Sequence, residues 1–100
     1  MSGKIIIIQP NGETTEQSWI KRGPPDFRTI QAAVGGTFAM CKVHYKGKAR
    51  TAYANDDGLA LQLPVNNTAT QMARQYGYDV LVGPVAVWVP DPPKAKVGPR

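Results

Sequence analysis

Ile5-Ile6-Ile7-Ile8 is the stretch that decides the fold, because four consecutive β-branched side chains are stiff and suit the pleated surface of a strand. The run has no polar alternation, so both of its faces are expected to be buried, as in a central strand. Pro10-Asn11-Gly12 follows as a turn signal, after which residues 14–20 can return as a second strand. The chain therefore begins with a predicted β-hairpin.

The next segment has the signals of a short amphipathic helix. Gly23-Pro24-Pro25 breaks the chain, and Asp26 then stands where an N-cap carboxylate accepts backbone N–H groups. Gly35-Gly36 provides the stop, because glycine readily adopts the left-handed conformation that ends many helices. The predicted buried stripe between these signals consists of Phe27, Ile30, Ala33 and Val34.

A second hairpin is predicted after this helix. Residues 37–45 alternate between two faces, Lys46-Gly47-Lys48 turns the chain, and residues 49–54 return. Asn55-Asp56-Asp57-Gly58 is a further turn, because its polar side chains can bond their own backbone. One face of the first strand carries Ala39, Cys41, Val43 and Tyr45, and the other carries Phe38, Met40, Lys42 and His44.

The second predicted helix has several competing N-terminal signals. Thr68 and Gln71 have the spacing of a capping box, while Asn66 and Asn67 are alternative N-caps. Gly77 is expected to end the helix. The predicted buried stripe consists of Ala69, Met72, Ala73 and Tyr76.

The last predicted strand covers residues 85–89 and reaches Pro90. Residues 80–82 are also strand-like, and Gly83-Pro84 between the two segments is expected to mark a sheet edge or a bulge. The element order is β-β-α-β-β-α-β, an α+β fold in two layers with both helices on one face of a mainly antiparallel sheet. Residues 1–90 form the predicted single domain, and the proline-rich, basic residues 91–100 are predicted to be a disordered tail.

Composition limits the class of partner without naming one. The 100 residues contain 12 Lys and Arg against 7 Asp and Glu, and the formal net charge of +5 favours anionic partners. The longest aliphatic run has four residues, far short of the roughly 20 that cross a bilayer. The run is also too short for the apolar core of a signal peptide, so we expect a cytoplasmic protein without a membrane contact.

A catalytic or metal site cannot be assembled from these residues. A structural zinc site needs about four Cys or His ligands, and Cys41 and His44 are the only ones in the sequence. Residues three apart in a strand point to opposite faces, so the pair is also unsuited to nucleophilic catalysis. Asp56 and Asp57 are expected to bond turn backbone rather than a cation. We therefore expect no enzymatic activity, no metal and no cofactor.

The strongest candidate for a ligand contact is the basic second hairpin. Cations beside aromatic faces are the composition that phosphate contact and base stacking use together, although a basic hairpin tip is also typical of a solvated loop. The candidate stacking residues are Tyr45 and Tyr53. The candidate anion contacts are Lys42, His44, Lys46, Lys48 and Arg50.

Four segments carry a resemblance to a known family. They are DFRTIQAAVGG at residues 26–36, NDDG at residues 55–58, LPVNNTAT at residues 63–70 and DVLVGPV at residues 79–85. With these segments in this order, the chain resembles the domain of unknown function 3846 family, small proteins found largely in phages, plasmids and their bacterial hosts. The resemblance implies a mobile-element setting, in which small single domains are often accessory factors, and it implies no activity and no functional residues.

We therefore expect a non-enzymatic, phage-type accessory binding protein that counters a host defence. It would bind a host protein, or sequester an anionic nucleotide-like signal through the basic hairpin. The alternative is a small nucleic-acid-binding or regulatory module, which the positive charge favours, although no recognition-helix or aromatic RNA-binding motif is present. Unpaired strand edges also allow a homo-oligomer.

Overall fold

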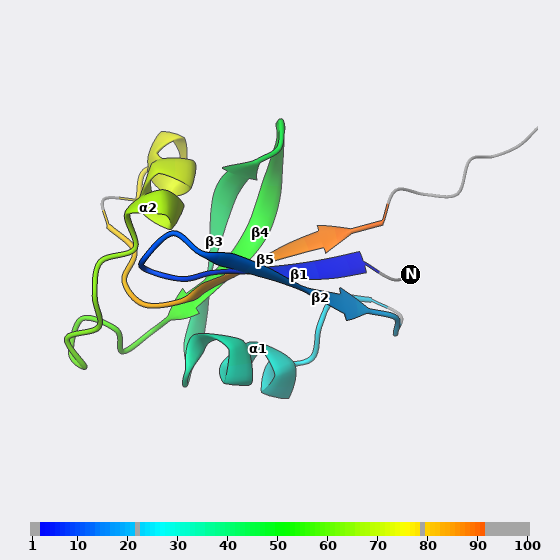
Figure 1. Cartoon of the computed structure of the whole chain (residues 1–100), viewed down its shortest axis with the longest axis horizontal. Helices are drawn as coiled ribbons and strands as arrows, with labels where there is room; N and C mark the ends of the chain where they lie inside the picture. The colour runs from blue at the N-terminus through cyan, green and yellow to red at the C-terminus, as the bar shows by residue number, and fades with distance from the viewer. Residues whose placement is uncertain (1–2, 22, 79, 92–100) are drawn as a thin grey trace, which may run out of the picture.

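The computed structural model describes residues 3–91 except residues 22 and 79, and it has the predicted order of elements (Figure 1). The α+β class and the antiparallel sheet with two short helices are confirmed. Nearly all of the predicted tail lies outside the described residues. The elements are β1 (Gly3–Ile8), β2 (Thr14–Trp19), α1 (Phe27–Val34), β3 (Phe38–Tyr45), β4 (Lys48–Asn55), α2 (Asn67–Ala73), the 3-10 helix η1 (Arg74–Tyr76) and β5 (Val85–Pro90).

The five strands form one antiparallel sheet in the order β2-β1-β5-β4-β3. β1 lies between β2 and β5, and Ile5, Ile6 and Ile8 are each at most 2% exposed. The prediction of a central strand that is buried on both faces is therefore confirmed. The hairpins β1–β2 and β3–β4 form the two outer parts of the sheet, and β5 joins them in the middle.

The prediction that Gly83-Pro84 marks a sheet edge or a bulge is wrong. β5 is the middle strand, and it begins at Val85, directly after Pro84. A proline that precedes the first residue of a strand removes no hydrogen bond from the ladder, so it is compatible with a central strand. The strand-like residues 80–82 form no strand, and Val82 makes an isolated bridge with Val65.

The two helices pack on opposite faces of the sheet, so the prediction that both lie on one face is wrong (Figure 1). Ile30 and Val34 of α1 cluster with Ile5, whereas Ala69 of α2 clusters with Ile6. Consecutive strand residues point to opposite faces, and the apolar β1 therefore needs a cover on each side. We call these the α1 face and the α2 face.

The ends of α1 agree with the sequence signals. The Asp26 carboxylate accepts a hydrogen bond from the Thr29 backbone N–H at 2.9 Å. Hydrogen bonding from the side chain and then the backbone of Thr29 holds the pKa of Asp26 below its usual value. Gly35 ends the helix with a φ of 85°. Phe27, which was predicted in the buried stripe, is 58% exposed. No helix in the described part of the chain is long and apolar enough to cross a membrane.

α2 starts from Asn66, one of the three predicted N-caps. The Asn66 side chain accepts a hydrogen bond from the Ala69 backbone N–H at 3.0 Å, so the N-cap lies two residues before the predicted Thr68 capping box. Its amide group also donates to the carbonyl oxygens of Ile8 and Gly83. Asn66 therefore ties α2 to the end of β1 and to the chain just before β5. Gly77 ends the helical segment in a left-handed conformation, as predicted.

Candidate binding site

The basic hairpin extends beyond the rest of the sheet. β3 and β4 pair over their full lengths, whereas β4 pairs with β5 only over three residues, Ala52 to Ala54. Residues 42–51 therefore form a two-stranded projection, which we call the arm (Figure 1). At about 3.3 Å per residue, the four residues in each of its strands, 42–45 and 48–51, span roughly 13 Å.

A two-residue turn ends the arm. Tyr45 pairs with Lys48, and Lys46 and Gly47 between them have φ values of 48° and 84°. Two consecutive positive φ values are typical of a type I′ turn, whose twist matches that of the flanking strands. The turn conformation therefore places Lys46 at the tip of the arm.

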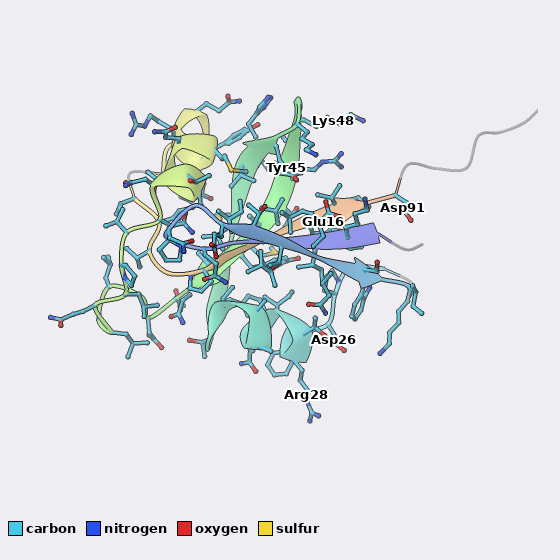
Figure 2. The ribbon with its side chains drawn as sticks, viewed as in Figure 1. Glu16, Asp26, Arg28, Tyr45, Lys48 and Asp91 are labelled. Carbon is cyan, nitrogen blue, oxygen red and sulfur yellow. The ribbon has the colours of Figure 1, made fainter. Side chains whose placement is uncertain are left out.

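The register distributes the predicted anion contacts over both faces of the arm. Residues directly opposite each other in an antiparallel pair point to the same face. Arg50 opposes the buried Val43, and Lys48 opposes Tyr45, so both cations lie on the α2 face. Figure 2 labels Tyr45 and Lys48 on the arm. The other predicted contacts lie elsewhere, with Lys42 and His44 on the α1 face and Lys46 at the tip. The arm thus presents cationic or titratable side chains on two faces and at its end.

The predicted stacking residues also lie on opposite faces. Tyr53 is 6% exposed and packs edge-on against Phe38, with ring centroids 5.4 Å apart at 84°. Burial raises the pKa of the Tyr53 hydroxyl. Tyr45 is half-buried, and the Lys46 ammonium lies 5.6 Å from the centre of its ring. Of the two tyrosines, Tyr45 alone offers a ring beside accessible cations.

Arg50 has an unusual environment for a cation on the arm. Its Nε is buried and has no hydrogen-bond acceptor among the described residues. The salt bridge between Lys4 and Glu16, at 3.6 Å, joins β1 to β2 and involves no arm cation. The planar guanidinium of arginine has a donor geometry that matches carboxylate and phosphate oxygens.

Met40 is a surface residue that the sequence did not single out. It is 67% exposed, and it precedes Lys42 and His44 at every second position of β3. These three side chains therefore point to the same side of the strand. The alternation of residues along β3 in the sequence would have been sufficient to predict that Met40, Lys42 and His44 share one face.

Cys41 is a buried thiol at the base of the arm. It is 9% exposed and lies on the α2 face, whereas His44 is exposed on the α1 face, so the expected separation of the two is confirmed. Burial raises the pKa of the Cys41 thiol to about 11. Near neutral pH the nucleophilic thiolate is therefore rare.

We predict that Cys41 reacts with a disulfide reagent at pH 8 about a hundredfold more slowly in the folded protein than in urea, because the thiolate is the reactive form. The release of the chromogenic thiol measures both rates. Equal rates in the two conditions would show that the side chain is accessible in the native state.

In the 55–58 turn the Asn55 side chain bonds the turn backbone, whereas the Asp57 carboxylate bonds a hydroxyl group outside the turn. The Asp57 backbone N–H donates to the Asn55 side chain at 2.8 Å, and the Thr37 hydroxyl donates to the Asp57 carboxylate at 3.1 Å. Among the described residues, no group of three or more His, Cys, Asp or Glu is placed to hold a metal ion.

Three hollows on the described surface lie away from the arm cations. One of about 770 Å³ lies beside the β1–β2 loop and Pro64, and one of about 460 Å³ lies between α1 and β2. A third, of about 180 Å³, includes Met40 and Cys41 at the base of the arm. Lys42, His44, Lys46, Lys48 and Arg50 line none of the three.

The fold and this surface define a small α+β protein with a basic β-hairpin arm. The chain belongs to the family described as a domain of unknown function (DUF3846), which matches residues 1–95. This match confirms the resemblance inferred from the four sequence segments. No match was found among curated proteins or among solved structures.

Proposed function

We propose that the protein is a non-enzymatic binding protein that docks its arm on an acidic surface of a partner protein. The observation that carries this proposal is the projecting arm itself, with Lys42 and His44 on one face, Lys48 and Arg50 on the other, and Lys46 at the tip. On the α2 face the arm packs on α2, where Val43 is buried with Ala69 and Ala73. The exposed Lys42, Lys46 and Lys48 would therefore make the contact with an anionic surface. They would raise the rate of encounter and fix the register of docking.

A protein surface suits the arm better than a small nucleotide does. The described hollows are not lined by arm cations, and Tyr53 is packed inside the fold rather than open for stacking. The exposed Met40 beside Lys42 adds an apolar contact of the kind found in protein interfaces.

The biological setting is part of the same proposal. An accessory factor of a phage or plasmid that binds a host protein, and so counters a host defence, is consistent with the small size of the domain and with the setting that the family resemblance implies. Sequestration of a nucleotide-like signal is the less favoured form of this function, because the arm cations line none of the described hollows and Tyr53 is buried.

Nucleic-acid binding is the second candidate, and the shape of the arm favours it. A two-stranded β-ribbon fits the major groove of a DNA duplex, and cations on both of its faces would reach the phosphates of both strands. The net charge of +5 acts in the same direction. This function predicts an affinity that falls steeply as salt is added.

We predict that neutralising the arm weakens binding to a labelled poly-glutamate peptide about tenfold, because three exposed charge pairs of a few tenths to 1 kcal/mol each are lost. The variant carries Lys42→Gln, Lys46→Gln and Lys48→Gln. Fluorescence anisotropy measures the binding. The matched control carries Lys21→Gln, Arg28→Gln and Arg74→Gln, which remove three exposed cations elsewhere, including Arg28 on α1 (Figure 2).

Equal losses in the two triple variants would contradict a role for the arm, because overall charge would then explain the binding. A duplex DNA of similar charge is titrated in parallel over a series of salt concentrations. Tighter binding to the duplex, with a steep salt dependence that the arm variant alone reduces, would replace the protein partner by nucleic acid.

A further inference from the structure

Among the described residues β2 is an edge strand of the sheet, and apart from Glu16 it lacks the usual features that block pairing. All of its side chains except Trp19 are exposed, and it pairs with β1 without interruption from Thr14 to Trp19. It contains no proline, no lysine and no bulge, which are common devices against edge-to-edge association. The other edge, β3, carries Lys42 and contacts α2.

We propose that β2 pairs with β2 of a second copy of this chain, around a two-fold axis at Gln17. This inference is independent of the proposed function. An antiparallel pairing of identical strands is isologous, and it closes as a dimer. The two arms would remain available, because β2 and the β3–β4 hairpin lie at opposite edges of the sheet (Figure 1).

The hairpin geometry shows which backbone groups of β2 point outward. The Gln9 N–H donates to the Glu13 carbonyl at 2.8 Å, so these two residues form a hydrogen-bonded pair. Hydrogen-bonded and non-hydrogen-bonded pairs alternate along an antiparallel ladder. It follows that the N–H and C=O groups of Thr14, Glu16 and Ser18 point away from β1, toward the open edge.

Three symmetric registers would pair these outward groups. Centring on Glu16 places two glutamates directly opposite each other, which like-charge repulsion disfavours. Centring on Thr15 leaves the outward groups of Ser18 facing the β1–β2 loop. Centring on Gln17 places Glu16 opposite Ser18 of the second copy and Thr14 opposite Ile20, the residue just after β2, so we select this register.

Two neighbouring features agree with the Gln17 register. Ile20, just after β2, is 85% exposed, and in this register it lies opposite Thr14 of the second copy. The hollow of about 460 Å³ between α1 and β2 is lined by Gln17 and Arg28. A two-fold axis perpendicular to the sheet keeps both α1 helices on one side, so the hollows of the two copies would join across the new strand pair.

A cysteine at the axis tests the register. In the Gln17 register the two copies of residue 17 form a non-hydrogen-bonded pair. Their Cα atoms would lie about 4.5 Å apart, within the roughly 4.4–6.8 Å range of disulfides. Gln17→Cys is therefore expected to form a covalent dimer under mild oxidation. Thr15→Cys is the matched control, because its two copies would lie about 13 Å apart along the strands. Cys41 stays in both variants, since it is buried.

A second variant tests the pairing without a new thiol. Ser18→Pro removes an outward N–H while leaving the β1 ladder intact, and proline is tolerated at such an edge position. In sedimentation velocity, the apparent mass of the unmodified chain should fall about twofold on dilution, whereas Ser18→Pro should sediment as a monomer at all concentrations. Circular dichroism melting checks that Ser18→Pro is folded.

Two results would overturn the proposal. One is a monomeric mass for the unmodified chain over the whole dilution series, together with no covalent dimer from Gln17→Cys. The other is cross-linking of Thr15→Cys at the rate of Gln17→Cys, because it would reveal random collision or the Thr15 register rather than the Gln17 axis.

Discussion

Asn66→Ala is expected to lower the free energy of unfolding by about 4 kcal/mol, because it removes an N-cap and the donor of two buried carbonyl groups. Asn66 is 0% exposed. Its amide nitrogen donates to the Ile8 carbonyl at 2.8 Å and to the Gly83 carbonyl at 2.9 Å, and its oxygen accepts from the Ala69 N–H at 3.0 Å. Alanine would leave both carbonyl groups buried without a donor and would open a small cavity.

Urea unfolding followed by tryptophan fluorescence measures this change. Asn67→Ala is the matched control, because Asn67 is the adjacent, exposed first residue of α2, and the change should stay within about 0.5 kcal/mol. A loss below about 1 kcal/mol for Asn66→Ala would show that the three bonds contribute little net stability.

Asn66→Asp separates the cap from the two donor bonds. Aspartate is a good N-cap, so it keeps the acceptor for Ala69, but it replaces the donating nitrogen with an oxygen that faces the carbonyl groups of Ile8 and Gly83. We expect Asn66→Asp to be at least as destabilising as Asn66→Ala, because a buried carboxylate is also desolvated. If Asn66→Asp lowered the free energy of unfolding only slightly, Asn66 would stabilise the fold through its N-cap bond alone.

Local signals were sufficient for the helix ends but not for the choice among rival signals. Asp26 and Gly35 act within a few residues of α1, and both were predicted correctly. At α2, three N-caps were compatible with the sequence. The bond from Asn66 to Ile8 spans 58 residues, so the choice of Asn66 depends on tertiary structure that local spacing does not contain.

The face on which each arm cation lies depends on whether the turn has two or three residues. With a three-residue turn at residues 46–48, Lys42 and Arg50 would fall on the same face of the hairpin. The structure has a two-residue turn, in which Tyr45 pairs with Lys48. With this register, Lys42 on β3 and Arg50 on β4 fall on opposite faces of the hairpin. The sequence contained the cations and the turn signal, but the register decides which of them meet a common ligand.

The placement of the helices was missed for a related reason. The run Ile5-Ile6-Ile7-Ile8 predicted burial on both faces, but no local signal assigned either helix to a face. In the structure, Ile5 packs in the cluster with α1, and Ile8 packs in the cluster with α2. Two separate apolar layers therefore stabilise the sheet, and each should make its own contribution to stability.

We expect Ile5→Ala and Ile8→Ala each to lower the free energy of unfolding by about 3 kcal/mol, the usual range for a buried isoleucine. The two side chains are 2% and 1% exposed, so both truncations leave cavities. Leu59→Ala is the control, because Leu59 is 72% exposed and its truncation should change stability by no more than about 0.5 kcal/mol. Urea unfolding measures all three.

The conservative changes Ile5→Val and Ile8→Val test whether the two layers are independent. Each should lower stability by about 1 kcal/mol, and the double variant should equal their sum within about 0.5 kcal/mol, because distant sites without shared partners are additive. An isoleucine that behaved like Leu59 would contradict burial on its face. A strongly non-additive double variant would instead indicate that the two layers form one coupled core, with β1 and β5 transmitting the strain between them.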